Sequence, residues 1–473
     1  MHWRISALLK PTSLAALFAA SVIILSTAIL EPIWNLHDDS YYSMISGGFG
    51  IVDAPSVEVP FMHPLVGYLL FGLNSIFGVW AYSLALFALL GISLFVLLRH
   101  ALQANVDYRS VAVISICVVP LLISPQYTMV SAWLTVCGLV ELRFALRCES
   151  GCRRRKIHLL FAVLWLSGSM LLRRDMTYFA IAVCFPLILW SEMRKREFRY
   201  WAILLASFCL MILVYSLTEY LLLAGEMREF LRLHAQRVPF LDYGVAKLAM
   251  REGLPLGVEP AYFRLWATWF FADQSLFSES QQIEVLTRYS LQTRLLSGVE
   301  KFWQQMGGLS LFVYTQIGAA LLVAVPFLRI VPRPQIFAAL SNFTAAIVVF
   351  ALLGRVVPDR VGLGLMLGML ATVLLIEGER SQSAKFASSL AKNRSSMILL
   401  TIAAVALTFC VFTVDRRNQH SMQAYDRPLW DLLGLSSNDV VYFSPGGLRL
   451  KSIFKPLRPS GAVAPARPRP RRA

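Results

Sequence analysis

The chain has 473 residues, of which 57% are hydrophobic and only 15% are charged. Soluble domains carry about 25% charged residues, and apolar runs of about 20 residues recur along this chain, so the sequence predicts an all-α polytopic membrane protein. The formal net charge of +16 does not indicate nucleic-acid binding, because much of the excess lies in short loops between apolar runs and in a basic tail, as membrane orientation produces.

The apolar runs predict eleven membrane spans, in four parts of the chain. The spans lie at about 12–33, 79–98, 110–124, 128–146, 157–172, 176–191, 200–222, 308–328, 335–353, 361–377 and 396–414. Basic loops after several spans place the N-terminus inside and the C-terminus outside. The parts are an N-terminal transmembrane module (1–222), a long outer loop (223–307), C-terminal spans (308–414) and a partly disordered outer tail (415–473).

The first outer loop, at about 34–78, opens with the adjacent carboxylates Asp38 and Asp39. A carboxylate at this position could act as a general base toward an acceptor hydroxyl. Its neighbour could raise its pKa by repulsion or help to hold a divalent ion such as Mg²⁺ or Mn²⁺. The alternative is a solvated loop in which one aspartate caps a short helix through Ser40–Ser46.

The second half of this loop, His63 to Gly72, is apolar and predicts a helix that lies at the membrane interface before the second span. Tyr41, Glu58 and His63 are candidate substrate-binding residues of the loop. A lone histidine before a proline is more often a structural hydrogen-bonding residue, and this alternative stays open for His63.

Four arginines stand on the outer side, against the positive-inside trend. Arg173 and Arg174 fall between the fifth and sixth spans, and Arg355 and Arg360 between the ninth and tenth. Guanidinium groups at the membrane boundary suit a phosphate, which they can bind in a bidentate manner. The alternatives are contact with lipid head groups or pairing with nearby aspartates. Asp175 is a candidate second acid beside the first arginine pair.

The long outer loop carries nine Lys or Arg and nine Asp or Glu residues. This composition, with its aromatic residues, predicts a folded or partly folded helical cap over a cavity. Trp266 and Trp269 are either interface anchors or a platform on which a sugar stacks. In the tail, residues 439–443 predict a short strand before a Pro-Gly-Gly turn, and residues 464–473 are rich in Pro and Arg.

Three short motifs, in this topology, resemble a known family. They are the acidic pair after the first span, the His63-Pro64 helix, and a late Gly354-Arg355-Val356-Val357-Pro358 segment. With the long loop between the seventh and eighth spans, the chain resembles the GT-C superfamily of integral-membrane glycosyltransferases, especially bacterial relatives of protein mannosyltransferases and aminoarabinose transferases. The acidic pair is Asp-Asp here, where Asp-Glu is common in the family.

The resemblance implies a sugar transferase of the bacterial inner membrane with its active site on the outer face. Its donor would be a polyprenyl-phosphate-linked sugar and its acceptor a glycan, lipid or protein. Asp38 would be the base beside Asp39, and Arg355 would bind the donor phosphate. Direct displacement would invert the anomeric centre and needs no nucleotide. Two alternatives remain: a polysaccharide polymerase or ligase, and a flippase or transporter of a lipid-linked saccharide. A transporter should carry charged residues within the membrane. Glu141 and Glu219 are the residues that come nearest to such a position.

Overall fold

The computed structural model describes residues 11–289, apart from gaps at 30–31, 33, 35–36, 50–51, 53, 105, 107, 150–151, 194–197, 242–244, 255–257, 261–262 and 264–276. Beyond residue 289 it describes only residues 341, 345, 365, 367–369, 371–372 and 375. The described residues do not include the predicted spans at 308–328 and 396–414, Trp266 and Trp269 of the long loop, Arg355, Arg360, the strand at 439–443 or the C-terminal tail.

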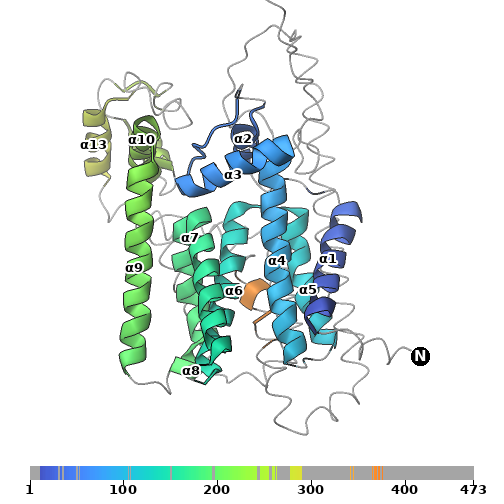
Figure 1. Ribbon diagram of the computed structural model, residues 1–473. Coiled ribbons are helices and arrows are strands. Elements are labelled where there is room, and N and C mark those ends of the chain that lie inside the picture. The colour runs from blue at the N-terminus through green and yellow to red at the C-terminus, as the bar shows by residue number, and fades with distance from the viewer. Residues whose placement is uncertain are drawn as a thin grey trace, which may run out of the picture.

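Helices make up the secondary structure of the described residues, and no strand occurs among them (Figure 1). Five helices agree with predicted spans to within five residues: α1 (Pro11–Ile29), α4 (Ala81–Gln103), α5 (Tyr108–Ile123), α6 (Tyr127–Arg147) and α9 (Phe198–Leu222). Five segments of the described chain are long and apolar enough to cross a membrane: Pro11–Ile29, Pro64–Gln103, Tyr127–Arg147, Arg153–Pro186 and Ala202–Leu222. The described part is therefore an all-α, multi-pass membrane architecture.

Helix α7 (Arg153–Ile188) is a hairpin, because the chain reverses at Arg173, where φ is −158° and ψ is 94°. The hydroxyl oxygens of Ser169 and Thr177 lie 2.6 Å apart, although eight residues span about 12 Å along a straight helix. Both ends of α7 also lie near the C-terminal end of α6: His158 contacts Glu141, and the carbonyl of Ile188 accepts from Arg143. The two arms correspond to the predicted spans 157–172 and 176–191.

The hairpin packs closely on α6 through small and hydroxylated residues. The hydroxyl of Ser169 lies 2.9 Å from that of Ser131 and 2.7 Å from that of Thr135. A Cβ atom on Gly138 would lie 2.7 Å from Leu166 Cγ, so the glycine permits the close approach of the two helices. Small residues and interhelical hydrogen bonds of this kind hold helices together in a bilayer. Leu365, Leu367, Ala371 and Leu375, within the predicted span 361–377, join the same core.

The bundle has two ends that differ in their polar residues. At one end, named here the α2 end, lie α2 (His37–Gly47), α3 (Pro64–Phe77) and the turn of the α7 hairpin; at the other, the α8 end, lie α8 (Trp190–Met193) and the first residues of α7 (Figure 1).

Helix α3 lies across the α2 end of the bundle (Figure 1). Gly78, at φ +57°, ends it and turns the chain through the 3₁₀ turn Gly78–Trp80 into α4. Its exposed side chains include Leu65, Leu69 and Phe71, which suits the interfacial position predicted for this segment.

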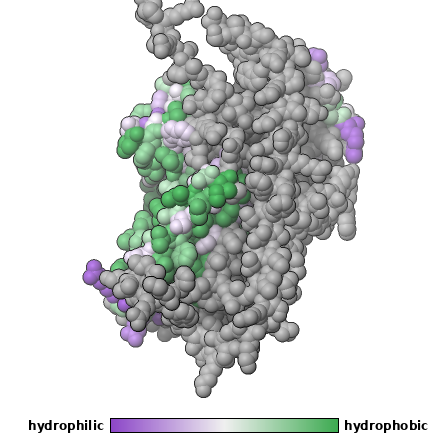
Figure 2. Space-filling model, turned by 90° about the vertical axis from the view of Figure 1, so that its right-hand side faces the viewer, coloured by the Kyte–Doolittle hydropathy of each residue, from purple (hydrophilic) through white to green (hydrophobic). Residues whose placement is uncertain are grey.

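The described surface is largely apolar where helices would face lipid. Figure 2 shows a green, hydrophobic area on the face it draws, with purple, hydrophilic residues toward its edges. Exposed apolar side chains of α1 include Ile24, Leu25 and Ile29, and those of α9 include Leu205 and Leu213. A contiguous apolar exterior is unfavourable in water and favourable in a bilayer.

Beyond α9, the described residues of the long loop form three helices with a core of their own. These helices are α10 (Gly225–Leu241), α11 (Val245–Glu252) and α13 (Glu279–Arg288). Phe240, Phe263 and Phe277 pack edge to face within this core. Ser278 and Gln281 form a capping box that fixes the start of α13. His234 of α10 contacts the ring of Phe61, 4.6 Å away, so this unit meets the α2 end.

Candidate functional site

The acidic pair lies in the first turn of α2, which begins at His37. The alternative of a short helix through Ser40–Ser46, capped by one aspartate, differs from the structure in its start, since α2 already includes both aspartates. Carboxylates in the first turn of a helix interact favourably with the unpaired backbone N–H groups there, which explains why α2 starts before the pair rather than after it.

Asp39 is the anchored member of the pair and is fully buried. Its Oδ1 accepts hydrogen bonds from the hydroxyl of Tyr82 on α4 (2.8 Å) and from the backbone N–H of Tyr127, the first residue of α6 (3.3 Å). A buried charge is stable only when such donors surround it. Asp39 therefore joins α2 to α4 and α6, and so helps to position the helix that carries its neighbour.

Asp38 is half-buried and acts electrostatically on Tyr42, Tyr127 and Arg173. The buried ring of Tyr42 meets Tyr127 edge on at 5.3 Å. Burial raises the pKa of Tyr42 well above its usual value, and Tyr127 and Asp38 raise it further, so Tyr42 remains a neutral phenol. Burial also raises the pKa of Tyr41, with Asp38 as the second cause. Asp38, the more accessible carboxylate of the pair, thus lies near several phenols and one guanidinium.

Arg173 extends from the turn of the α7 hairpin, with 26% of its side chain exposed. Its guanidinium lies over the rings of Phe61 (5.6 Å) and Tyr127 (5.9 Å). Its polar contacts are long: 3.4 Å to the hydroxyl of Tyr127 and 3.9 Å to Asp175. Charge-assisted hydrogen bonds are about 2.7–2.9 Å, and a guanidinium has five N–H donors. Arg173 therefore retains donor capacity for an anion.

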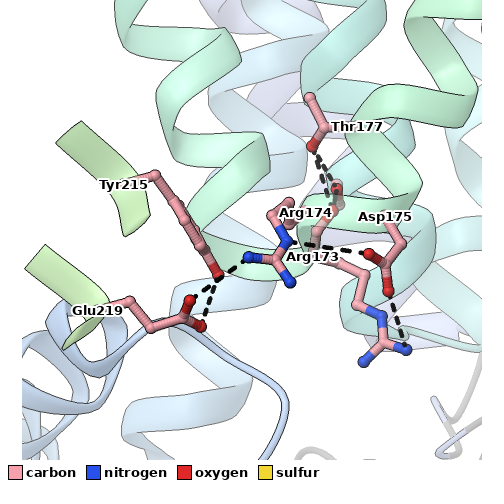
Figure 3. Close-up of polar contacts among 7 residues, drawn as sticks. Arg173, Arg174, Asp175, Thr177, Tyr215 and Glu219 are labelled. Carbon is pink, nitrogen blue, oxygen red and sulfur yellow. Dashed lines mark hydrogen bonds and ion pairs between the residues drawn. The ribbon is translucent and has the colours of Figure 1, made fainter. Parts of the chain in front are cut away.

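Arg174 points the other way, toward α9 (Figure 3). It lies 3.4 Å from the carboxylate of Glu219 and stacks over the ring of Tyr215 at 5.3 Å. Asp175 lies between the two arginines, 4.0 Å from Arg174, and 75% of its side chain is exposed. The alternative in which these arginines pair with Asp175 is thus present, but its contacts are long. Glu219, which the sequence places near the outer end of the seventh span, is the partner of Arg174.

His63 caps α3 and is buried. Its Nδ1 accepts from the backbone N–H of Leu65 (3.2 Å), while Nε2 faces the carbonyl of Tyr215 (3.2 Å) and the hydroxyl of Thr218 (3.1 Å). This pattern fits a neutral ring with its proton on Nε2, and burial lowers the pKa of His63. The geometry favours the structural alternative. Glu58 is half-buried in the preceding loop, where its N–H bonds to Ser56.

Phe61 is a residue of the site that the sequence did not reveal. It adopts φ +62°, and among the described residues it is the one non-glycine residue with positive φ. Such a backbone costs about 1–2 kcal/mol for an ordinary side chain and persists where surrounding contacts require it. The ring lies between the guanidinium of Arg173 and the imidazole of His234. No local sequence signal distinguishes this phenylalanine from its neighbours.

A group of potential metal ligands lies at the other end of the bundle from the acidic pair. Within the described residues, a group of three such side chains with ligand atoms within 4.8 Å of one another comprises His100, Glu141 and His158, at the α8 end. A Mg²⁺ or Mn²⁺ ion at the acidic pair remains a prediction from the sequence. The group at the α8 end joins three helices that are far apart in sequence, so no local spacing could have identified it.

In comparisons with known proteins, no family model, curated protein or solved structure matches the chain. The α2 end offers a half-buried carboxylate, a partly exposed guanidinium with unused donors, and neutral phenols that both groups influence.

Proposed function

We propose that this chain is a membrane glycosyltransferase. It moves a sugar from a polyprenyl-phosphate donor to an acceptor hydroxyl, with Asp38 as the general base and Arg173 as a ligand of the donor phosphate. The acceptor class is a glycan, a lipid or a protein.

The observation that carries the proposal is that Asp38 and Arg173 act electrostatically on each other and on Tyr127. The two residues are 135 positions apart in sequence, and α2 and the α7 turn bring them within electrostatic range of each other. Of the two aspartates, Asp38 suits the role of base better, because Asp39 is fully buried and its Oδ1 accepts two hydrogen bonds from other helices, whereas Asp38 is half-buried. Asp38 and Arg173 also stand at one end of the apolar bundle, at the depth where the phosphate of a lipid-linked donor would lie.

The proposed reaction is a single displacement. The carboxylate of Asp38 accepts the proton of the acceptor hydroxyl as that oxygen attacks the anomeric carbon. The bond between the anomeric carbon and the phosphate oxygen breaks, and the polyprenyl phosphate leaves with the bonding electron pair. The guanidinium of Arg173 stabilises the charge on the departing phosphate. One displacement inverts the anomeric centre. Arg355 and Arg360 remain further candidates for the phosphate on the basis of the sequence.

The test is transfer of radiolabel from polyprenyl-phosphate sugars to a crude cell-envelope acceptor by the purified full-length chain. Asp38→Asn should reduce transfer by about 10²–10⁴-fold, the usual contribution of a general base, and leave donor binding unchanged. Arg173→Gln should weaken donor binding. Glu226→Gln, which removes an exposed carboxylate in the first turn of α10, is the control and should behave as wild type.

Each alternative has its own outcome in this experiment. Label that crosses the bilayer of a proteoliposome without forming a new glycosidic bond would overturn the proposal in favour of a flippase. Products that lengthen by whole repeat units would indicate a polymerase. Full activity of Asp38→Asn would remove Asp38 as the base.

A further inference from the structure

At the α8 end, three helices place polar side chains around one buried carboxylate. Glu141 of α6 is fully buried. One of its oxygens lies 2.9 Å from Nε2 of His100 on α4, and the other lies 2.6 Å from Nδ1 of His158 on α7. Arg99 of α4 contacts the same carboxylate at 2.8 Å. The cluster lies outside the site described above, at the opposite end of the bundle.

The two histidines are not explained by charge neutralisation alone. A carboxylate inside a membrane bundle is costly and needs a partner, but Arg99 already supplies one unit of positive charge at hydrogen-bonding distance. His100 is fully buried and stacked on Phe144, with ring centroids 4.0 Å apart. Its Nδ1 has no hydrogen-bond partner among the described residues, so Nε2, which faces Glu141, is the polar atom that this ring uses.

Two imidazoles and one carboxylate form a donor set that suits zinc, which takes nitrogen ligands at about 2.0–2.1 Å and carboxylate oxygens at about 2.0–2.2 Å. Tetrahedral ligands at these distances are roughly 3.3 Å from one another. The ligand atoms of the three residues all lie within 4.8 Å of one another. Shifts of about 1 Å in the ligand atoms would therefore place all three at zinc-binding distances from one ion.

We propose that His100, Glu141 and His158 bind a zinc ion that joins α4, α6 and α7 at the α8 end. Three protein ligands leave the fourth position of the tetrahedron for water. The charge of the ion replaces that of Arg99 in neutralising Glu141. Arg99 is 17% exposed, and its long side chain can move its guanidinium toward the surface when the ion binds.

The competing description is a metal-free network in which Glu141 simply pairs with Arg99 and accepts from the two imidazoles. The two descriptions differ on Arg99. If zinc binds, the arginine competes with the ion for Glu141, so its removal should tighten zinc binding. If the network is only structural, removal of Arg99 creates no zinc affinity.

The first experiment measures metal binding to the full-length chain in detergent, purified with an affinity tag that lacks histidine and stripped with a chelator. Titration with Co²⁺ should give the intense visible absorption of a tetrahedral site, saturate at one ion per chain, and be reversed by Zn²⁺. His158→Ala, at the partly exposed edge of the cluster, should weaken binding more than about 100-fold. His234→Ala, which removes a histidine of α10, is the matched control and should bind as wild type.

The second experiment separates the two descriptions. Arg99→Gln should tighten zinc binding about tenfold and should increase the rise in melting temperature that Zn²⁺ produces. Wild type that binds no stoichiometric Co²⁺ or Zn²⁺ would overturn the proposal, as would His158→Ala that binds as wild type. An Arg99→Gln variant with unchanged or weaker affinity would also overturn it. These readouts are independent of transferase activity.

Discussion

The two ends of the bundle both bring acids and cations together, but with opposite geometry. At the α8 end, Glu141 is fully buried and its contacts are between 2.6 and 2.9 Å. At the α2 end, the contacts of Arg173 and Arg174 with their acidic partners are between 3.4 and 4.0 Å. Short contacts around a fully buried carboxylate leave its oxygens well supplied with donors, whereas long contacts at a partly exposed site leave arginine donors for an anion. The same residue types thus suit different tasks at the two ends.

The largest difference in stability should appear when one acid is removed from each end. Glu141→Ala should lower the free energy of unfolding by about 3–5 kcal/mol, because it leaves the buried His100 and its neighbours Arg99 and His158 without their shared acceptor. Asp175→Ala should change it by less than about 0.5 kcal/mol, because that side chain is 75% exposed. Thermal unfolding of both variants in metal-free detergent solution measures the contrast. Equal losses would show that the two ends do not differ as their geometry indicates.

Within the α2 end, the two adjacent aspartates should separate in the same way. Asp39→Ala leaves two buried donors, on Tyr82 and Tyr127, without their acceptor. Each such group costs about 1–3 kcal/mol, so a loss of about 2–4 kcal/mol is expected. Asp38→Ala should lose less than about 1 kcal/mol, since Asp38 is half-buried. Denaturation of both variants is the measurement, and a larger loss for Asp38→Ala would reverse the assigned roles.

A glycine pair on α3 tests how the α2 end is positioned. A Cβ on Gly67 would overlap the carbonyl oxygen of Val57, whereas one on Gly72 would meet nothing within 4 Å. Gly67→Ala should cost about 1–3 kcal/mol and shift the loop that carries Phe61, so donor affinity should fall as well. Gly72→Ala should be neutral or stabilise by up to about 1 kcal/mol. Similar melting temperatures for the two variants would contradict this packing.

The smallest effect concerns pH. Burial lowers the pKa of His63 in the folded chain, although Tyr215 and Glu219 oppose the shift. The unfolded chain therefore binds this proton more readily, and His63 contributes stability above about pH 6.5 that is lost as the pH falls. His63→Asn keeps a side-chain acceptor for the cap of α3 and should show a shallower loss of melting temperature between pH 7 and pH 5. An unchanged slope would mean that His63 titrates normally in the folded state.

The sequence predicted the described spans well, because apolar periodicity and length govern membrane helices. It also placed Arg173, Arg174 and Asp175 at a break between two spans, where the chain does reverse. It could not divide the roles of the aspartates, since the partners of Asp39 are contributed by α4 and α6.

The sequence likewise missed Phe61 and the cluster around Glu141. Each depends on contacts between residues that are far apart in the chain, and neither is marked by a motif of closely spaced residues. The spans and the polar breaks were thus readable from the sequence, whereas the packing that gives each charge its task was not.

The hydroxyl groups between α6 and the α7 hairpin bear on how the bundle is held together. Lipid tails are as apolar as leucine, so helices gain little by the hydrophobic effect when they associate in a bilayer, and hydrogen bonds and close packing must hold them. Ser131, Thr135, Ser169 and Thr177 all belong to one continuous stretch of chain. The contacts of this three-helix unit therefore do not depend on α9. The contacts of Arg174 and His63 at the α2 end, in contrast, need Tyr215 and Glu219 of α9.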